Sequence, residues 1–125
     1  MASSSTTKFL CLFLILGLAS PSLATEHVVG DLLGWNLLVD FNAWASARVF
    51  KVGDTLRFNY LPLVHNVVRL PNEASLLNCI TDTKLFIDGS GSTSFALNQI
   101  GDFYFCSSLF TDCLLNLKMK VSVVA

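Results

Sequence analysis

The end of the chain alternates between apolar and polar side chains with the two-residue period of a β-strand. Phe103 and Phe105 fall on one face of the first stretch, residues 101–106. The side chains between and after them, Tyr104 and Cys106, fall on the other face. A short loop follows, and a second stretch then alternates apolar with polar positions; its apolar positions are Met119, Val121 and Val123. Two such stretches predict two β-strands that each have one apolar face.

The same pattern recurs in short pieces through most of the chain. Further strands are predicted at residues 25–30, 49–52, 55–60, 65–70 and 92–97. Turn residues separate them, as at Gly53-Asp54 and at residues 88–91. Short helices are predicted at residues 40–47, with Asp40 as the N-cap, and at residues 72–78. About seven short strands with so little helix favour an all-β fold, a sandwich or a barrel.

The N-terminus has the order of segments that directs a protein to secretion. Lys8 precedes a continuous apolar run at residues 9–19, and small residues follow at residues 22–24. This order predicts a signal peptide at residues 1–24 and one secreted domain at residues 25–125. A membrane anchor is the alternative, but the run is too short to cross a hydrocarbon core of about 30 Å. No second apolar segment follows, so we expect no transmembrane segment in the mature chain.

Neither the charges nor the polar motifs indicate a nucleic-acid-binding protein or an enzyme. Without Lys8, seven Lys and Arg remain of the eight in the chain, against nine Asp and Glu, and they form no run of one sign. No base accompanies the serine-rich stretches, and no glycine-rich phosphate loop follows a strand. We therefore expect no catalytic residues and no nucleic-acid partner.

The cysteines predict one disulfide and one free thiol. Cys11 lies in the predicted signal peptide, which leaves Cys79, Cys106 and Cys113 in the secreted domain. Three cysteines in an oxidising compartment allow one disulfide. Their spacing alone does not choose the pair.

Several motifs, taken in order, resemble the phytocyanins, the plant blue-copper proteins. They are the HVVGD at residues 27–31, Gly34-Trp35, the FNAWA at residues 41–45, the FKVGDTLRFNY at residues 50–60, and the HNV at residues 65–67. The loop between the last two predicted strands completes the series. The resemblance covers the whole secreted domain, with the stellacyanin-like or mavicyanin-like group nearest. It implies a cupredoxin-like Greek-key β-sandwich, present as a monomer, from a family that transfers electrons.

The same resemblance aligns four residues with the copper ligands of the family. His65 aligns with the first ligand histidine, Ser107 with the ligand cysteine, Asp112 with the second histidine, and Leu117 with the axial Met or Gln. A blue-copper site needs a thiolate, two imidazoles and a weak axial group. Because only the histidine is kept, we expect a degenerate site with no bound copper, as in the early nodulin-like proteins of this family.

The cysteine positions of the family imply a disulfide between Cys79 and Cys113, with Cys106 as a free, buried thiol. An alternative alignment moves Cys106 onto the ligand-cysteine position and keeps His65 as a second ligand, with Asp112 as a possible third. It requires a deletion in the preceding strand, and it turns Cys106 toward the face of Phe103 and Phe105. On this alternative the protein is a copper-binding electron carrier.

The resemblance therefore predicts a non-copper extracellular binding or structural module, located in the cell wall or at the outer face of the plasma membrane. Its partner is expected to be a cell-wall carbohydrate or a cell-surface protein. Asp112 is expected to face solvent at the end of its loop. Five nearby apolar residues are expected either to form a binding surface or to fill the former copper pocket; they are Leu109, Phe110, Leu114, Leu115 and Leu117.

Overall fold

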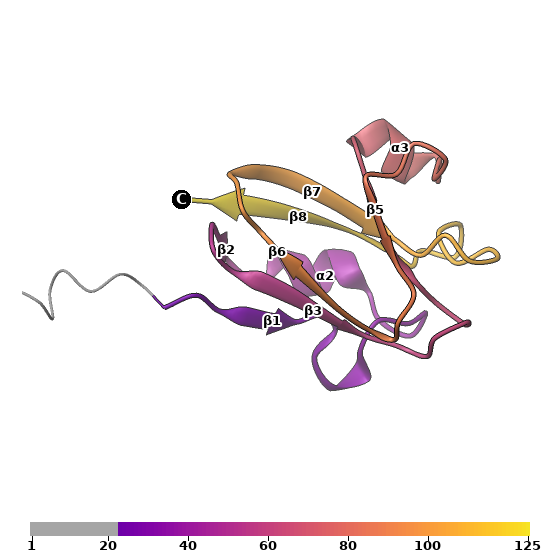
Figure 1. Ribbon diagram of the computed structural model, residues 1–125, viewed down its shortest axis with the longest axis horizontal. Helices are drawn as coiled ribbons and strands as arrows, with labels where there is room; N and C mark the ends of the chain where they lie inside the picture. Colours follow the sequence, from indigo (N-terminus) through magenta and orange to yellow (C-terminus); the bar gives the residue numbers. More distant parts are fainter. Residues whose placement is uncertain (1–22) are drawn as a thin grey trace, which may run out of the picture.

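The computed structural model describes residues 23–125, so the predicted signal peptide lies almost wholly outside the described residues. Two β-sheets face each other (Figure 1). The smaller sheet has the order β1 (Glu26–Val28), β3 (Thr55–Asn59), β6 (Ser92–Ala96). The larger sheet has the order β2 (Phe50–Lys51), β8 (Lys118–Val124), β7 (Gly101–Cys106), β4 (Val67–Leu70), β5 (Phe86–Asp88). The predicted all-β sandwich is confirmed.

The strand pairs differ in direction, and the register of the last pair decides which side chains enter the core. The pairs β1–β3 and β2–β8 are parallel, and the other pairs are antiparallel. The long pair β7–β8 sets Phe103 opposite Val121 and Phe105 opposite Met119. All four side chains are buried between the sheets, so the predicted alternation of the last two strands is confirmed.

The core between the sheets is rich in aromatic rings. Trp35 packs against Phe41 and against the edge of Phe58, with ring centroids 4.6 and 5.1 Å apart. Phe58 in turn contacts Phe105, with centroids 5.3 Å apart. These rings come from both sheets and from the segment before β2, and large buried rings supply much of the apolar area that stabilises a small domain.

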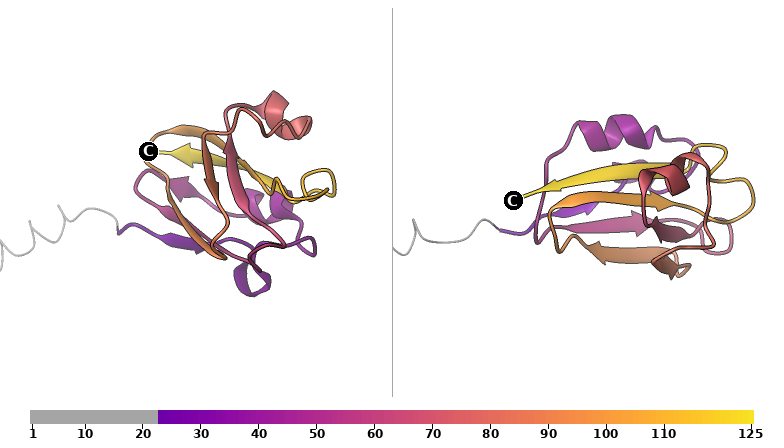
Figure 2. Two further views of the ribbon diagram at one scale, coloured as in Figure 1. Left: turned by 45° about the vertical axis from the view of Figure 1, so that its right-hand side comes forward. Right: turned by 90° about the horizontal axis from the view of Figure 1, so that it is seen from above.

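Two short α-helices lie where the sequence predicts them. In α2 (Phe41–Ser46), the Asp40 side chain accepts a hydrogen bond from the backbone N–H of Ala43 at 3.2 Å, as expected of an N-cap. In α3 (Glu73–Leu77), Asn72 has the same role. A single turn of 3₁₀-helix, η1 (Asp31–Leu33), precedes Gly34. Helix α2 lies against β8, and α3 lies against β7 and β4 (Figure 2).

The outer face of the larger sheet carries a second apolar cluster under α3. It includes Val68, Leu70, Leu76, Cys106 and Cys113. Cys113 forms a disulfide with Cys79, as the family resemblance implies, and Cys106 is free and buried. A disulfide in a domain of this size contributes about 2–4 kcal/mol of stability. No helix among residues 23–125 is long and apolar enough to cross a membrane.

Candidate functional site

The loop between β7 and β8 lies at the end of the sandwich opposite the C-terminus (Figure 1). Its two ends are tied together by backbone hydrogen bonds, from Ser107 N–H to Leu117 O at 3.1 Å and from Leu117 N–H to Asp112 O at 2.9 Å. Asn116 takes the left-handed φ of 77° that this closure requires, as asparagine does more readily than most residues. The closed loop holds Ser107, Asp112 and Leu117 at the base of one site.

Three of the four aligned positions form one hydrogen-bonded group, which we call the polar network: His65, Asp112 and Ser107. His65 Nδ1 lies 2.8 Å from Asp112 Oδ2, and the Ser107 hydroxyl donates to the same oxygen at 2.6 Å. All three residues are buried. The expectation that Asp112 faces solvent is wrong, because its carboxylate turns inward to accept both hydrogen bonds.

The backbone next to β4 completes the hydrogen bonding of Ser107. Asn66 N–H donates to the Ser107 hydroxyl at 3.2 Å. The Asn66 side chain also exchanges two hydrogen bonds with Ser108, from Ser108 N–H at 2.7 Å and to the Ser108 hydroxyl at 2.9 Å. The segments 65–66 and 107–108 are therefore held side by side, and the polar network has little freedom to rearrange.

The apolar side chains of the loop divide between the two roles that the sequence left open. Leu117 is fully buried and belongs to the main core, so it fills space beside the polar network. Phe110 and Leu114 are 85% and 74% exposed, and Leu115 is exposed as well. The neighbouring loop before β4 adds the exposed Leu61 and Leu63. We call these five exposed residues the apolar end.

Cys106 lies on the other side of β7 from the polar network. Its side chain packs in the outer cluster with Val68 and Leu70, whereas Phe105 before it belongs to the main core. Burial raises the pKa of the Cys106 thiol to about 11, and the charge of Lys118 offsets only part of this effect. The structure therefore does not bring Cys106 together with His65.

A second buried histidine pair was missed by the sequence analysis. His27 Nε2 lies 2.8 Å from Asp54 Oδ2, and both side chains are buried. Asp54 also accepts hydrogen bonds from the N–H groups of Thr25 and Lys51, each at 3.0 Å. Burial acts to raise the pKa of Asp54, but these hydrogen bonds outweigh it and leave the pKa below its usual value. The only sequence signal was the Gly53-Asp54 turn, which gives no partner.

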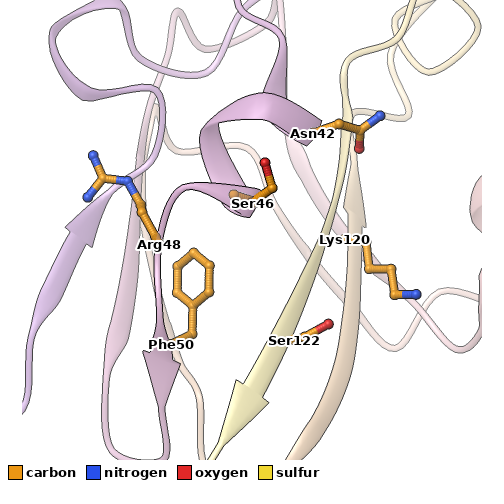
Figure 3. A pocket seen from close by; sticks show the side chains of 7 residues that line it. Asn42, Ser46, Arg48, Phe50, Lys120 and Ser122 are labelled. Atoms are coloured by element: carbon orange, nitrogen blue, oxygen red, sulfur yellow. The ribbon is translucent and has the colours of Figure 1, made fainter.

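A pocket of about 300 Å³ lies between α2 and β8 (Figure 3). Its two cationic side chains are already paired. Arg48 bonds to Asp31 and stacks on Trp44, and Lys120 Nζ lies 3.4 Å from Glu73 Oε1. With its charges neutralised from within the chain, this pocket offers a weaker case for a ligand than the site around His65.

No group of three or more His, Cys, Asp or Glu side chains within residues 23–125 is arranged to hold a metal ion. The polar network contributes two such side chains, His65 and Asp112. The chemistry available at the site is hydrogen bonding by an imidazole, a carboxylate and a hydroxyl.

The sequence profile of the plastocyanin-like domain matches residues 35–116. A blue copper protein of Pisum sativum is 34% identical over 125 residues, which cover 100% of this chain and 66% of that protein. Early nodulin-16 of Medicago truncatula is 34% identical over 131 residues, covering 98% of this chain and 71% of that protein. The chain thus spans about two thirds of the length of these relatives.

Two solved structures have the same fold and related sequences. Cucumber stellacyanin with Cu²⁺ has a TM-score of 0.76 and 30% identity, with 83% of this chain and 98% of that chain covered. Cucumber basic protein, a blue copper protein, has a TM-score of 0.72 and 30% identity, with coverages of 79% and 99%. On the strength of the sequence profile, the relatives and the shared fold, this chain belongs to the phytocyanin family.

Proposed function

We propose that this protein is a secreted phytocyanin domain that does not hold type 1 copper and acts as an extracellular binding or structural module. The observation that carries the proposal is the polar network. At the positions aligned with three copper ligands, His65, Ser107 and Asp112 bond to one another. The proposal includes a signal peptide at residues 1–24, a domain at residues 25–125, and no enzymatic activity.

The side chains at the aligned positions do not fit a blue-copper centre. Such a centre needs a thiolate sulfur, two imidazole nitrogens and a weak axial ligand. The chain offers one imidazole, a hydroxyl, a carboxylate and the apolar side chain of Leu117. Hydroxyl and carboxylate oxygens suit hard cations better than copper in an electron carrier. We therefore derive no electron-transfer step through this site.

The Asp112 carboxylate and the Ser107 hydroxyl have their hydrogen-bond partners within the protein, without a metal. Buried polar atoms need partners, and a buried carboxylate needs more than one. Asp112 Oδ2 accepts from His65 and from Ser107, while Ser107 also accepts from Asn66 N–H. This arrangement supports a domain whose folding does not depend on an ion at this site.

The alternative, a copper carrier that uses His65 and Cys106, has less support. A thiol binds a metal as the thiolate, and burial of Cys106 disfavours that form. To reach His65, Cys106 would have to leave the outer apolar cluster and turn to the opposite face of β7. Ionising this buried thiol and moving it out of the outer apolar cluster would each lower the stability of the fold.

The apolar end is the surface on which we expect a partner to bind. Exposed apolar patches on a soluble domain often mark interaction sites. Within residues 61–64 and 109–115 the only charged residue is Asp112, which is buried, so no exposed charge interrupts this surface. A cell-surface protein or a cell-wall carbohydrate is the expected partner of a monomeric domain in the apoplast.

The visible spectrum of the purified protein with copper(II) tests this proposal. A blue site absorbs intensely at about 600 nm through its thiolate–copper bond. We expect no such band, whereas a matched triple variant with Ser107→Cys, Asp112→His and Leu117→Met should gain it. A blue wild-type protein would overturn the proposal.

A further inference from the structure

The outer side of His65 faces a pocket that the family alignment does not address. The pocket has a volume of about 230 Å³ and lies between the turn after η1 and the end of β3. Besides His65 its walls include Trp35, Asn36, Asn59, Tyr60 and Leu61. Its position is separate from the α2–β8 pocket described above.

The polar network determines which ring nitrogen of His65 is left to accept a hydrogen bond from a ligand in this pocket. An ionised carboxylate only accepts hydrogen bonds, so the nitrogen that faces Asp112, Nδ1, carries the proton. In the neutral ring, Nε2 is then an acceptor. Nε2 bonds to no residue among 23–125, and it is not one of the fully buried polar atoms without a partner there. His65 is only 9% exposed and is one of the residues that line the pocket, which places this acceptor next to it.

The walls of the pocket are held in place by contacts within the chain. Trp35 N–H donates to Asn59 O at 2.8 Å, and the Trp35 indole N–H donates to Asn66 O at 2.9 Å. Gly34 has φ 74°, and a Cβ there would lie 2.6 Å from Asn59 O, so a glycine is needed for this close approach. Tyr60 is fixed by its hydroxyl, which bonds to Asp88 O and to Thr93. The pocket is therefore formed before any ligand enters.

The lining decides the chemistry of the ligand. None of the lining side chains is an acid, a lysine or an arginine, and the one histidine, His65, already faces the Asp112 carboxylate, so the lining favours an uncharged ligand. Asn59 is exposed, and its side-chain amide can both donate and accept hydrogen bonds. Leu61 and Tyr60 add apolar surface. The volume is below the 300–1,000 Å³ of typical drug-sized sites, which suits a ligand about as large as one sugar ring.

We propose that this pocket binds one uncharged sugar ring, with a ligand hydroxyl donating to His65 Nε2 and a second hydroxyl bonded to the Asn59 amide. Asp112 and Ser107 act as positioning residues, because they hold the ring tautomer that leaves Nε2 as an acceptor. This inference rests on the proposed function as an extracellular binding module, and it assigns that module a site and a ligand class.

An NMR titration tests the site directly. Methyl β-D-xyloside and methyl β-D-glucoside are added to ¹⁵N-labelled protein, up to about 50 mM, because a site with few hydrogen bonds binds in the millimolar range. We expect saturable shifts of the His65 ring nitrogens and of the amides of Asn59 and Leu61. The free protein should already show a protonated Nδ1 on His65. A free ring with the proton on Nε2 would overturn the proposal.

Two variants separate binding from folding. Asn59→Ala removes an exposed amide and should weaken binding about fivefold, the loss expected for one or two hydrogen bonds. The matched control Asn98→Ala, in the exposed connection between β6 and β7, should leave binding unchanged. Equal affinity in wild type and Asn59→Ala, or the absence of saturable shifts with either glycoside, would overturn the sugar site.

A charged ligand provides the last comparison. D-glucuronate carries a carboxylate on the same ring, and it should bind no more tightly than the glucoside, since no lysine or arginine lines the pocket and His65 already faces Asp112. Tighter binding of glucuronate would contradict the assignment of an uncharged ligand. Failure of the sugar site would leave the non-copper proposal standing, because that proposal is tested separately by the copper spectrum.

Discussion

The molecule contains two buried histidine–aspartate pairs that share one nitrogen–oxygen distance but use different ring nitrogens, Nε2 in His27 and Nδ1 in His65, and differ in their surroundings. His27–Asp54 and His65–Asp112 both have a nitrogen–oxygen distance of 2.8 Å. Asp54 also accepts two backbone N–H groups, whereas Asp112 accepts the side-chain hydroxyl of Ser107. The first pair joins β1, the end of β2 and the turn before β3. The second occupies the aligned copper positions, and its His65, whose Nε2 bonds to no residue among 23–125, lines a pocket. The same two residue types therefore stabilise the fold in the first pair and can take part in ligand binding in the second.

The largest expected effect comes from breaking the first pair. Asp54→Ala removes the acceptor of His27 and of two backbone N–H groups at once, so we expect it to lower the free energy of unfolding by about 3–5 kcal/mol. Urea unfolding followed by circular dichroism measures this loss. The matched control is Asp102→Ala at an exposed carboxylate near Lys120, where the expected loss is about 0–1 kcal/mol. Equal losses in the two variants would show that the Asp54 pair is not structural.

The second pair is expected to contribute less to stability. Asp112→Ala leaves His65 and Ser107 without their shared acceptor, and we expect a loss of about 1–3 kcal/mol because water can reach the ring through the pocket. Asp112→Asn keeps an acceptor oxygen and should lose less than Asp112→Ala. The same unfolding experiment compares all three variants. A larger loss for Asp112→Ala than for Asp54→Ala would reverse the roles assigned to the two pairs.

Acidification should separate the contribution of Asp54 from the rest of the fold. The pKa of Asp54 is below the ordinary value because hydrogen bonds, led by that from His27, outweigh the opposing effect of burial. A lowered pKa stabilises the fold fully above the unfolded value of about 3.9, and this contribution is lost as pH falls through the folded pKa. The stability gap between wild type and Asp54→Asn should therefore be wide at about pH 7 and 5 and narrow at about pH 3. A gap that widens on acidification would contradict this assignment.

The smallest expected effect concerns the Cys106 thiol, on the opposite face of β7 from the second pair. Because burial raises the pKa of Cys106 to about 11, iodoacetamide at about pH 8 should leave the folded protein unmodified. Unfolding without reduction should then expose this thiol, as detected by mass spectrometry of the peptide. Rapid modification of Cys106 in the folded protein would show that it is accessible and ionised, as the copper-carrier alternative requires.

Patterns within a few residues of the sequence predicted the strands and helix caps that depend on neighbouring residues. The alternation around Phe103 and Phe105, and the cap at Asp40, follow from strand and helix geometry within a few residues. Strand β5 was missed because it runs into the turn predicted at residues 88–91, and its one strand partner is β4. The polar network was incompletely predicted for a related reason. Asp112 is 47 residues from His65 in the chain, and its burial results from that distant partner.

The alignment proposed four positions for the site but did not predict that three of them are hydrogen-bonded to one another. A loop aspartate flanked by Thr111 and Cys113 is ordinarily solvated, and no sequence pattern indicates that Ser107 and His65 share its oxygen. The pocket on the far side of His65 is equally non-local, since its walls come from segments near residues 35 and 60. Sequence predicted which residues a copper site would use, and the structure was needed to see the network that they form.

The melting temperature of the purified protein with and without copper(II) is the most direct test of the claim that hydrogen bonds, and not a metal, complete this site. Binding to the native state alone stabilises a protein, by about 2.7 kcal/mol when the ligand is at a hundred times its Kd. We predict that copper(II) leaves the melting temperature of the wild-type protein unchanged. A strong rise in the melting temperature of the wild type that is lost in His65→Ala would contradict this claim. It would show that the chain binds copper at this site, as the copper carriers of its family do.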